Sequence, residues 1–107
     1  MTIERGTTQS LYITIKGLDL TGCDIYVTFR QGGVVLTKNT MESVAYANNA
    51  TRIQLQLTQE ETMAFKTGES GKVQVRWIGS DEKAHKTKTA PFDVDELLYE
   101  AVLVKED

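Results

Sequence analysis

Apolar and polar residues alternate along most of this 107-residue chain, so that every second side chain is apolar. A period of two is typical of strands that bury one face of a sheet and expose the other. The pair Gly32-Gly33 between two such segments predicts a tight hairpin, and Asn48-Asn49 predicts a second turn. The alternation predicts strands over residues 10–16, 24–30, 34–38, 41–46, 52–57, 72–78 and 83–89, and a last strand that begins near Phe92.

One helix is predicted, near residues 59–66. Thr58 and Glu61 have the spacing of a capping box, in which the threonine hydroxyl accepts from the Glu61 N–H and the Glu61 carboxylate accepts from the Thr58 N–H. Gly68 follows Lys66 and predicts the end of the helix. Two turns are too short to be stable alone, so we expect this helix to lie against the sheets.

Seven to eight short strands with turns about every ten residues predict an all-β fold, namely an antiparallel immunoglobulin-like β-sandwich with one short helix. An open barrel with the same strands is the alternative. The length suits a single domain over residues 1–107. Residues 96–104 fit either a strand or a helix, and Leu97, Leu98 and Val102 are candidates to dock on the core.

The charge balance excludes some functions. The chain has 12 basic and 15 acidic residues, a net charge of −3, whereas nucleic-acid binders usually carry a basic surplus. No apolar run approaches the roughly 20 residues that cross a bilayer, and the N-terminus does not resemble a signal peptide. We therefore expect no nucleic-acid or membrane partner, and synthesis in the cytoplasm.

The residue types needed for catalysis are sparse. Cys23 and His85 are the only cysteine and histidine, which rules out an intramolecular disulfide and argues against a zinc site with three or four such ligands. A nucleophilic cysteine paired with His85 is one hypothesis, but a small buried cysteine is the simpler interpretation. No phosphate-binding loop or hydrolase motif occurs. The sequence predicts neither enzymatic activity nor a metal or cofactor.

Several exposed positions are candidates for an interaction surface. Tyr12 and Tyr26 fall on outward faces of neighbouring predicted strands, where they form either an interaction patch with Thr14 and Thr28 or an ordinary exposed pair. Trp77 is expected in the core, with a sugar-stacking platform as the alternative. The polar segment 83–89 is either a solvated edge strand or a site for an anionic partner, and its basic residues are Lys83, His85, Lys86 and Lys88.

An acidic segment lies towards the C-terminus. It is either a solvated tail or a surface complementary to the lysine-rich strand of a neighbouring copy. Its spacing does not match a dedicated calcium loop. Its members are Asp93, Asp95, Glu96, Glu100, Glu106 and Asp107.

The order of several motifs resembles a known family. The segments Leu57-Thr58-Gln59-Glu60-Glu61-Thr62 and Val73-Gln74-Val75-Arg76, after an opening Arg5-Gly6-Thr7-Thr8, resemble the N-terminal β-sandwich domain of tail baseplate upper proteins from phages of Gram-positive bacteria. The resemblance implies a phage or prophage structural protein that assembles with other virion or tail proteins, or with itself, and is located in the virion. Baseplate proteins usually carry further domains after this one, which this chain does not include, so we expect a small connector or accessory protein. The family supplies no catalytic residues.

Two function hypotheses follow. The first is a non-enzymatic virion protein, of the tail or baseplate, that assembles through exposed strand edges. The alternative is a carbohydrate-binding or cell-surface-binding module, in which Tyr12, Tyr26, Tyr46 and Trp77 supply stacking rings.

Overall fold

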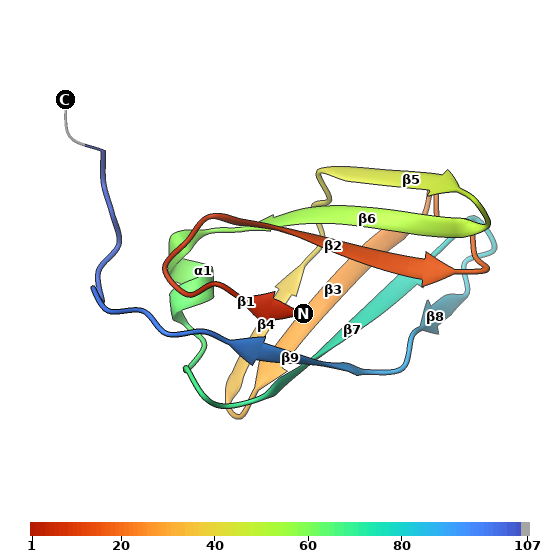
Figure 1. The fold of residues 1–107 in the computed structure, drawn as a ribbon. Helices are drawn as coiled ribbons and strands as arrows, with labels where there is room; N and C mark the ends of the chain where they lie inside the picture. Colours follow the sequence, from red (N-terminus) through yellow and green to blue (C-terminus); the bar gives the residue numbers. More distant parts are fainter. Residues whose placement is uncertain (106–107) are drawn as a thin grey trace.

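The computed structural model describes residues 1–105, so Glu106 and Asp107 of the predicted acidic segment lie outside the described residues. Figure 1 shows strands in two layers with one short helix at one end of the molecule. The elements are β1 (Thr2–Ile3), β2 (Gln9–Lys16), β3 (Asp24–Gln31), β4 (Val34–Lys38), β5 (Ser43–Ala47), β6 (Ala50–Leu57), α1 (Gln59–Met63), β7 (Gly71–Ile78), β8 (Ala84–Lys86) and β9 (Ala90–Val94).

The strands form two sheets. The larger sheet has the order β1-β9-β7-β3-β4, with β8 also paired to β7, and the smaller sheet has the order β2-β6-β5. This is the order of an immunoglobulin-like sandwich, with β3, β4, β7 and β9 in the positions of strands C, C′, F and G, and β2, β6 and β5 in those of B, E and D. The predicted fold class is therefore confirmed. All pairs are antiparallel except β1 with β9.

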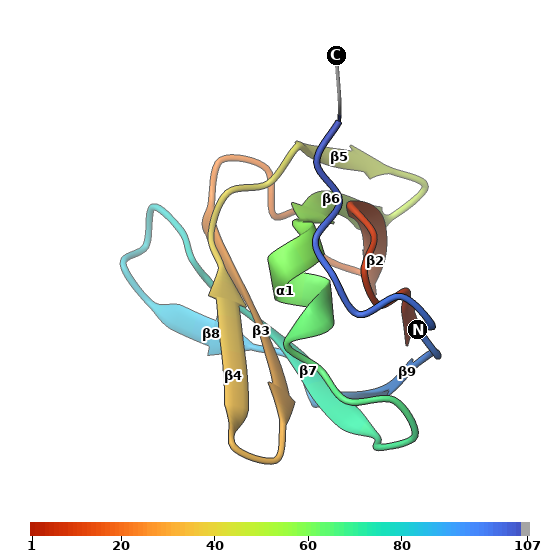
Figure 2. The same cartoon turned by 90° about the vertical axis from the view of Figure 1, so that its left-hand side faces the viewer.

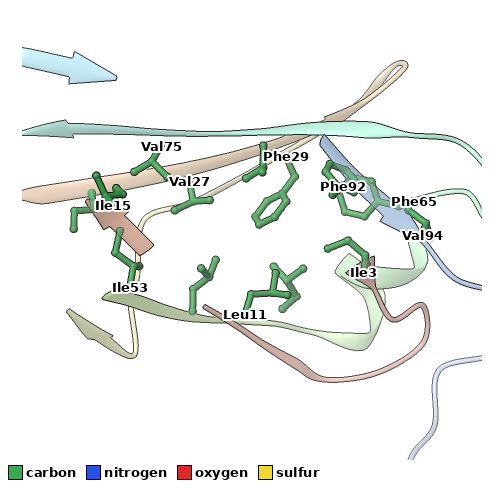
Figure 3. Packing of buried hydrophobic residues seen from close by; sticks show 14 of the residues in the cluster. Ile3, Leu11, Ile15, Val27, Phe29, Ile53, Phe65, Val75, Phe92 and Val94 are labelled. Atoms are coloured by element: carbon green, nitrogen blue, oxygen red, sulfur yellow. The ribbon is translucent and has the colours of Figure 1, made fainter. Parts of the chain in front are cut away.

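One cluster of apolar side chains fills the space between the layers. Figure 3 shows these side chains reaching towards one another from both sheets. Phe29, Phe65 and Phe92 meet edge to face or tilted, with ring centroids 5.3–6.4 Å apart, a favourable geometry for aromatic packing. The chain has a single cysteine, so no disulfide within the chain joins the two sheets. The burial of apolar side chains holds them together.

Local sequence signals appear where they were predicted. Gly32 (φ 56°) begins the β3–β4 turn, and Asn48 and Asn49 (φ 52° and 58°) form the β5–β6 turn. The capping box is present at α1, where the Glu61 N–H donates to Thr58 Oγ1 and the Thr58 N–H donates to Glu61 Oε1. Figure 2 shows α1 lying across the gap between the layers, as expected.

The helix is shorter than the predicted 59–66. It ends at Met63, where Arg5 from a distant part of the chain caps free carbonyl groups. Arg5 donates through Nε to the Phe65 carbonyl and through Nη2 to the Met63 carbonyl. Phe65 then turns into the core, where it is fully buried.

The strand predicted over residues 83–89 is shorter in the structure, where β8 covers only Ala84–Lys86, because a β-bulge interrupts it. Arg76 pairs with Lys86, and Val73 pairs with Ala90. Positions 76 and 73 are three residues apart in β7, whereas positions 86 and 90 are four residues apart, so the segment opposite β7 contains one extra residue. The extra residue reverses the alternation. Lys86 therefore lies on the outer face, whereas Phe92, another even-numbered residue, points into the core.

Two further differences concern the ends of the chain. β1, which buries Ile3, is not anticipated by the alternation. Residues 96–104 form neither a strand nor a helix. Leu97 is partly buried over Gly6, whereas Leu98 and Val102 are exposed, so the expected docking holds for Leu97 alone. Within residues 1–105, no helix has the length and apolar character to cross a membrane.

Candidate functional site

A hollow of about 580 Å³ lies between two loops, which Figure 1 places at the end of the sandwich opposite α1. The loop between β2 and β3 and the loop between β7 and β8 form its walls, which are the positions of the B–C and F–G binding loops in antibody domains. Polar groups line much of it, among them Asp19, Thr21, Ser80, Asp81 and His85.

Buried and local hydrogen bonds shape the first of these loops. Thr51 on β6 is fully buried, and its hydroxyl accepts from the Leu20 N–H and donates to the Leu18 carbonyl. The Asp19 carboxylate accepts from the hydroxyl and the N–H of Thr21, and these hydrogen bonds lower the pKa of Asp19. The loop is therefore held by a strand of the smaller sheet and carries a carboxylate that stays ionised.

Trp77 lies at the inner wall of the hollow. It is partly buried and packs against the apolar core, so the expectation of core packing holds in part. Its ring stacks on His85, its cross-strand neighbour, with centroids 5.8 Å apart and an interplanar angle of 24°. His85 Nε2 also lies 3.7 Å from Asp81 Oδ2, an ion pair when the imidazole is protonated. Trp77 thus sits at the end of β7, where the core gives way to the loops.

Cys23 and His85 line this same hollow. Within residues 1–105, no hydrogen bond links the thiol to the imidazole, which instead faces Trp77 and Asp81. The same part of the chain has no group of three His, Cys, Asp or Glu placed to hold a metal ion. The hollow offers an aromatic ring, carboxylates and hydroxyls, which are groups that bind polar ligands.

The two tyrosines proposed as one patch lie on opposite sides of the molecule, because β2 and β3 belong to different sheets. Tyr12 lies on the outer face of the smaller sheet, with the Arg52 guanidinium 4.3 Å from the centre of its ring. Tyr26 lies on the outer face of the larger sheet, opposite Arg76. The structure does not bring these tyrosines together.

Of the basic residues in segment 83–89, only Lys86 joins Tyr26. Tyr26, Arg76 and Lys86 form a row across β3, β7 and β8. Arg30 and Lys72 form a second cross-strand pair on the same face. The sequence interpretation missed these arginines and Lys72, although the period-two pattern assigns them to the outward face of their strands.

Lys83, His85 and Lys88 lie away from this row. Lys83 precedes β8, His85 faces the loop hollow, and Lys88 lies in the bulge. All three are exposed. The basic stretch is therefore divided between three places, because the bulge and the short β8 prevent a regular strand.

A second hollow, of about 290 Å³, runs beside β2. β2 pairs only with β6, so the other edge of this eight-residue strand has no strand beside it in the described chain. Most of its lining is apolar, and Tyr12 and Lys88 also line it. The apolar residues that line it include Ile13, Ile15, Val73 and Val75.

Comparison with known proteins does not decide between these surfaces. Neither the protein-family models nor the curated proteins match the chain.

Proposed function

We propose that this protein is a non-enzymatic structural or assembly component of a phage or prophage particle, in its tail or baseplate, and that it acts through protein–protein contacts in the virion. The open edge of β2 carries the proposal. An unpaired strand presents a row of N–H and C=O groups to which another chain can add.

The nature of the edge supports this interpretation. Natural edge strands are often short, or carry prolines or many charges, which prevent unwanted pairing. β2 is eight residues long and its only charged residue is Lys16 at the end. The apolar hollow beside it provides room for the side chains of an added strand.

The resemblance to baseplate upper proteins supports the particle context. Its motifs coincide with elements that build the sandwich, namely the capped helix α1 and strand β7. They are motifs of fold rather than of catalysis, so they favour an assembly role and supply no reaction.

The test uses the proteins encoded beside this gene. Each is purified and titrated against this protein by calorimetry, with Thr14→Lys as the edge variant and Thr37→Lys, on the outer face of β4, as its control. We expect a neighbouring tail or baseplate protein to bind this protein. We expect Thr14→Lys to weaken this binding and Thr37→Lys to leave it unchanged. Failure to bind every neighbour, together with a monomeric state at all concentrations, would contradict the proposal.

The loop hollow favours a second candidate, a carbohydrate-binding or cell-surface-binding module. A sugar site needs an accessible aromatic ring beside polar groups. Trp77 with Asp19 and Asp81 provides this combination, although His85 covers one face of the ring. Trp77 is the single tryptophan, so its fluorescence reports binding. Saturable quenching by purified bacterial cell-wall polysaccharide, weakened by Asp81→Asn, would support this function, and an unchanged spectrum would exclude it.

A further inference from the structure

The chain after β9 is an exposed apolar arm, defined here as residues 97–105. Figure 1 shows it leaving the sandwich at the α1 end and running away from the body. Leu98 is 87% exposed and Val104 is 82% exposed, so both side chains project almost entirely into solvent. Large apolar side chains concentrated on a soluble protein indicate a contact surface. Those exposed on the arm are Leu98, Tyr99, Val102, Leu103 and Val104.

Few contacts hold the arm to its own domain. Arg5 donates to the Glu100 carboxylate, and the amide of Gln59 makes two hydrogen bonds with the Leu103 backbone. In the second contact, the side-chain amide of Gln59 provides partners for both the N–H and the carbonyl of Leu103. Leu97 is partly buried over Gly6, but the five large apolar side chains that follow it stay exposed.

We propose that the arm of one copy adds as a strand to the open β2 edge of a second copy. This inference rests on the proposed assembly function and names its partner. The arm supplies an exposed apolar segment, which bends at Tyr99 and Ala101 in the single copy and would extend on binding. The β2 edge supplies unpaired backbone groups beside an apolar hollow. Each copy carries both halves of the contact.

The alternation within the arm matches the two sides of that edge. In an extended chain Tyr99, Ala101 and Leu103 lie on one side and Glu100, Val102 and Val104 on the other. The first side carries no charge and fits the hollow over Ile13 and Val75. The second side then lies over the outer face of the smaller sheet.

The charges agree with this placement. Glu100 would lie beside the outer face of the smaller sheet, which carries Lys16 and Arg52, and Lys88 is among the residues that line the hollow. Release of Glu100 from Arg5 breaks an ion pair in which the carboxylate is 56% exposed and the Arg5 side chain is 15% exposed. Arg5 keeps its hydrogen bonds to the Met63 and Phe65 carbonyls after this release. Exchange of the arm is therefore compatible with a stable domain.

The other main opening of the sandwich fits the arm less well. It lies beside β5, which has five residues against eight in β2. Its hollow of about 250 Å³ includes Asp24 and Asn39 among its lining residues. An apolar arm that carries Glu100 on its outer side is better matched to the β2 edge.

Self-association is measured first, by sedimentation equilibrium of the whole chain over a range of concentrations. We expect a concentration-dependent mass, and we expect Leu103→Asp to weaken association by at least about tenfold, as loss of an anchoring side chain does. Val35→Asp, on β4 of the other sheet and equally exposed, is the matched control and should change nothing. Circular dichroism confirms that both variants fold.

Cross-linking then identifies the edge. In a Cys23→Ser background, a Val104→Cys protein is mixed with a Thr14→Cys protein and treated with a short bismaleimide. A covalent heterodimer is expected from this mixture and not from Val104→Cys with Val35→Cys. A monomeric wild type, or cross-linking that does not distinguish Thr14 from Val35, would overturn the inference. Either result would leave the proposed function to be judged by binding to the neighbouring proteins.

Discussion

At the scale of single residues, three buried polar side chains form hydrogen bonds with backbone groups that have no backbone partner. These are Gln31, Thr51 and Thr62. Gln31 is 3% exposed, and its amide donates to the carbonyls of Lys66 and Glu69 and accepts from the Lys66 N–H. Gln31 thus provides hydrogen-bond partners for backbone groups of the loop that leads from α1 to β7, because no neighbouring strand pairs with them.

Replacement of Gln31 should reveal the value of these hydrogen bonds. Gln31→Leu keeps the size of the side chain and leaves three backbone groups without a partner, so we expect unfolding to become easier by about 2–3 kcal/mol. The measurement is urea denaturation followed by Trp77 fluorescence. Gln56→Leu, at an exposed position of β6, is the control and should lie within about 0.5 kcal/mol of wild type. Equal effects of both variants would contradict this role.

At the scale of elements, α1 is a five-residue helix that is stable only through contacts from elsewhere. Arg5 caps its C-terminal end, and Lys38 on β4 donates to Glu61 at its N-terminal end, at 2.8 and 3.0 Å. Burial raises the pKa of Glu61, but hydrogen bonds from Lys38 and the Thr58 N–H, with the charge of Lys38, outweigh it and lower the pKa overall.

The lowered pKa predicts a loss of stability in acid. Because the folded pKa of Glu61 lies below its ordinary value of 4.5, its contribution is fully present above that pH and disappears as the pH falls through the folded pKa. Glu61→Gln should therefore be less stable than wild type at pH 7, by about 1–3 kcal/mol. The difference should shrink towards pH 3, as measured by urea unfolding at each pH.

Lys38→Met tests the pairing itself. Combined with Glu61→Gln, it should cost less than the sum of the two single changes, since each removes the same charged hydrogen bonds. Additive losses, or a pH-independent effect of Glu61→Gln, would show that the ion pair does not stabilise the helix.

At the scale of the whole molecule, the aromatic cluster joins the layers, and one glycine makes room for it. A Cβ on Gly71 of β7 would overlap the ring of Phe92 on β9. Close-packed interiors resist added atoms because neighbouring side chains leave their preferred rotamers. Gly71 therefore sets how closely β9 and its phenylalanine approach the centre of the sandwich.

An added methyl group at this position should loosen the sandwich. Gly71→Ala is expected to lower the free energy of unfolding by about 1–3 kcal/mol, measured by urea or thermal denaturation. Gly33→Ala places its Cβ in open space at the β3–β4 turn and should have a much smaller effect. Comparable losses for the two variants would contradict the steric explanation.

Much of the fold was predictable because its signals are local. Alternation assigned most strands and their buried faces, and Thr58 with Glu61 marked the start of α1. Of the candidate surfaces, the sequence identified Tyr26 and Lys86 but not the row they form with Arg76. A row across a sheet depends on strand pairing, which a period-two pattern does not specify.

The sequence by itself determined which segments become strands, where the chain turns and which side of most strands is apolar, because these properties depend on neighbours a few residues apart. Only the tertiary structure decided that Tyr12 and Tyr26 face opposite ways, that a bulge separates Lys86 from Phe92, and that β2 keeps an open edge. Each of these follows from pairing between distant segments, whose register is set by burial of one shared core rather than by the local pattern.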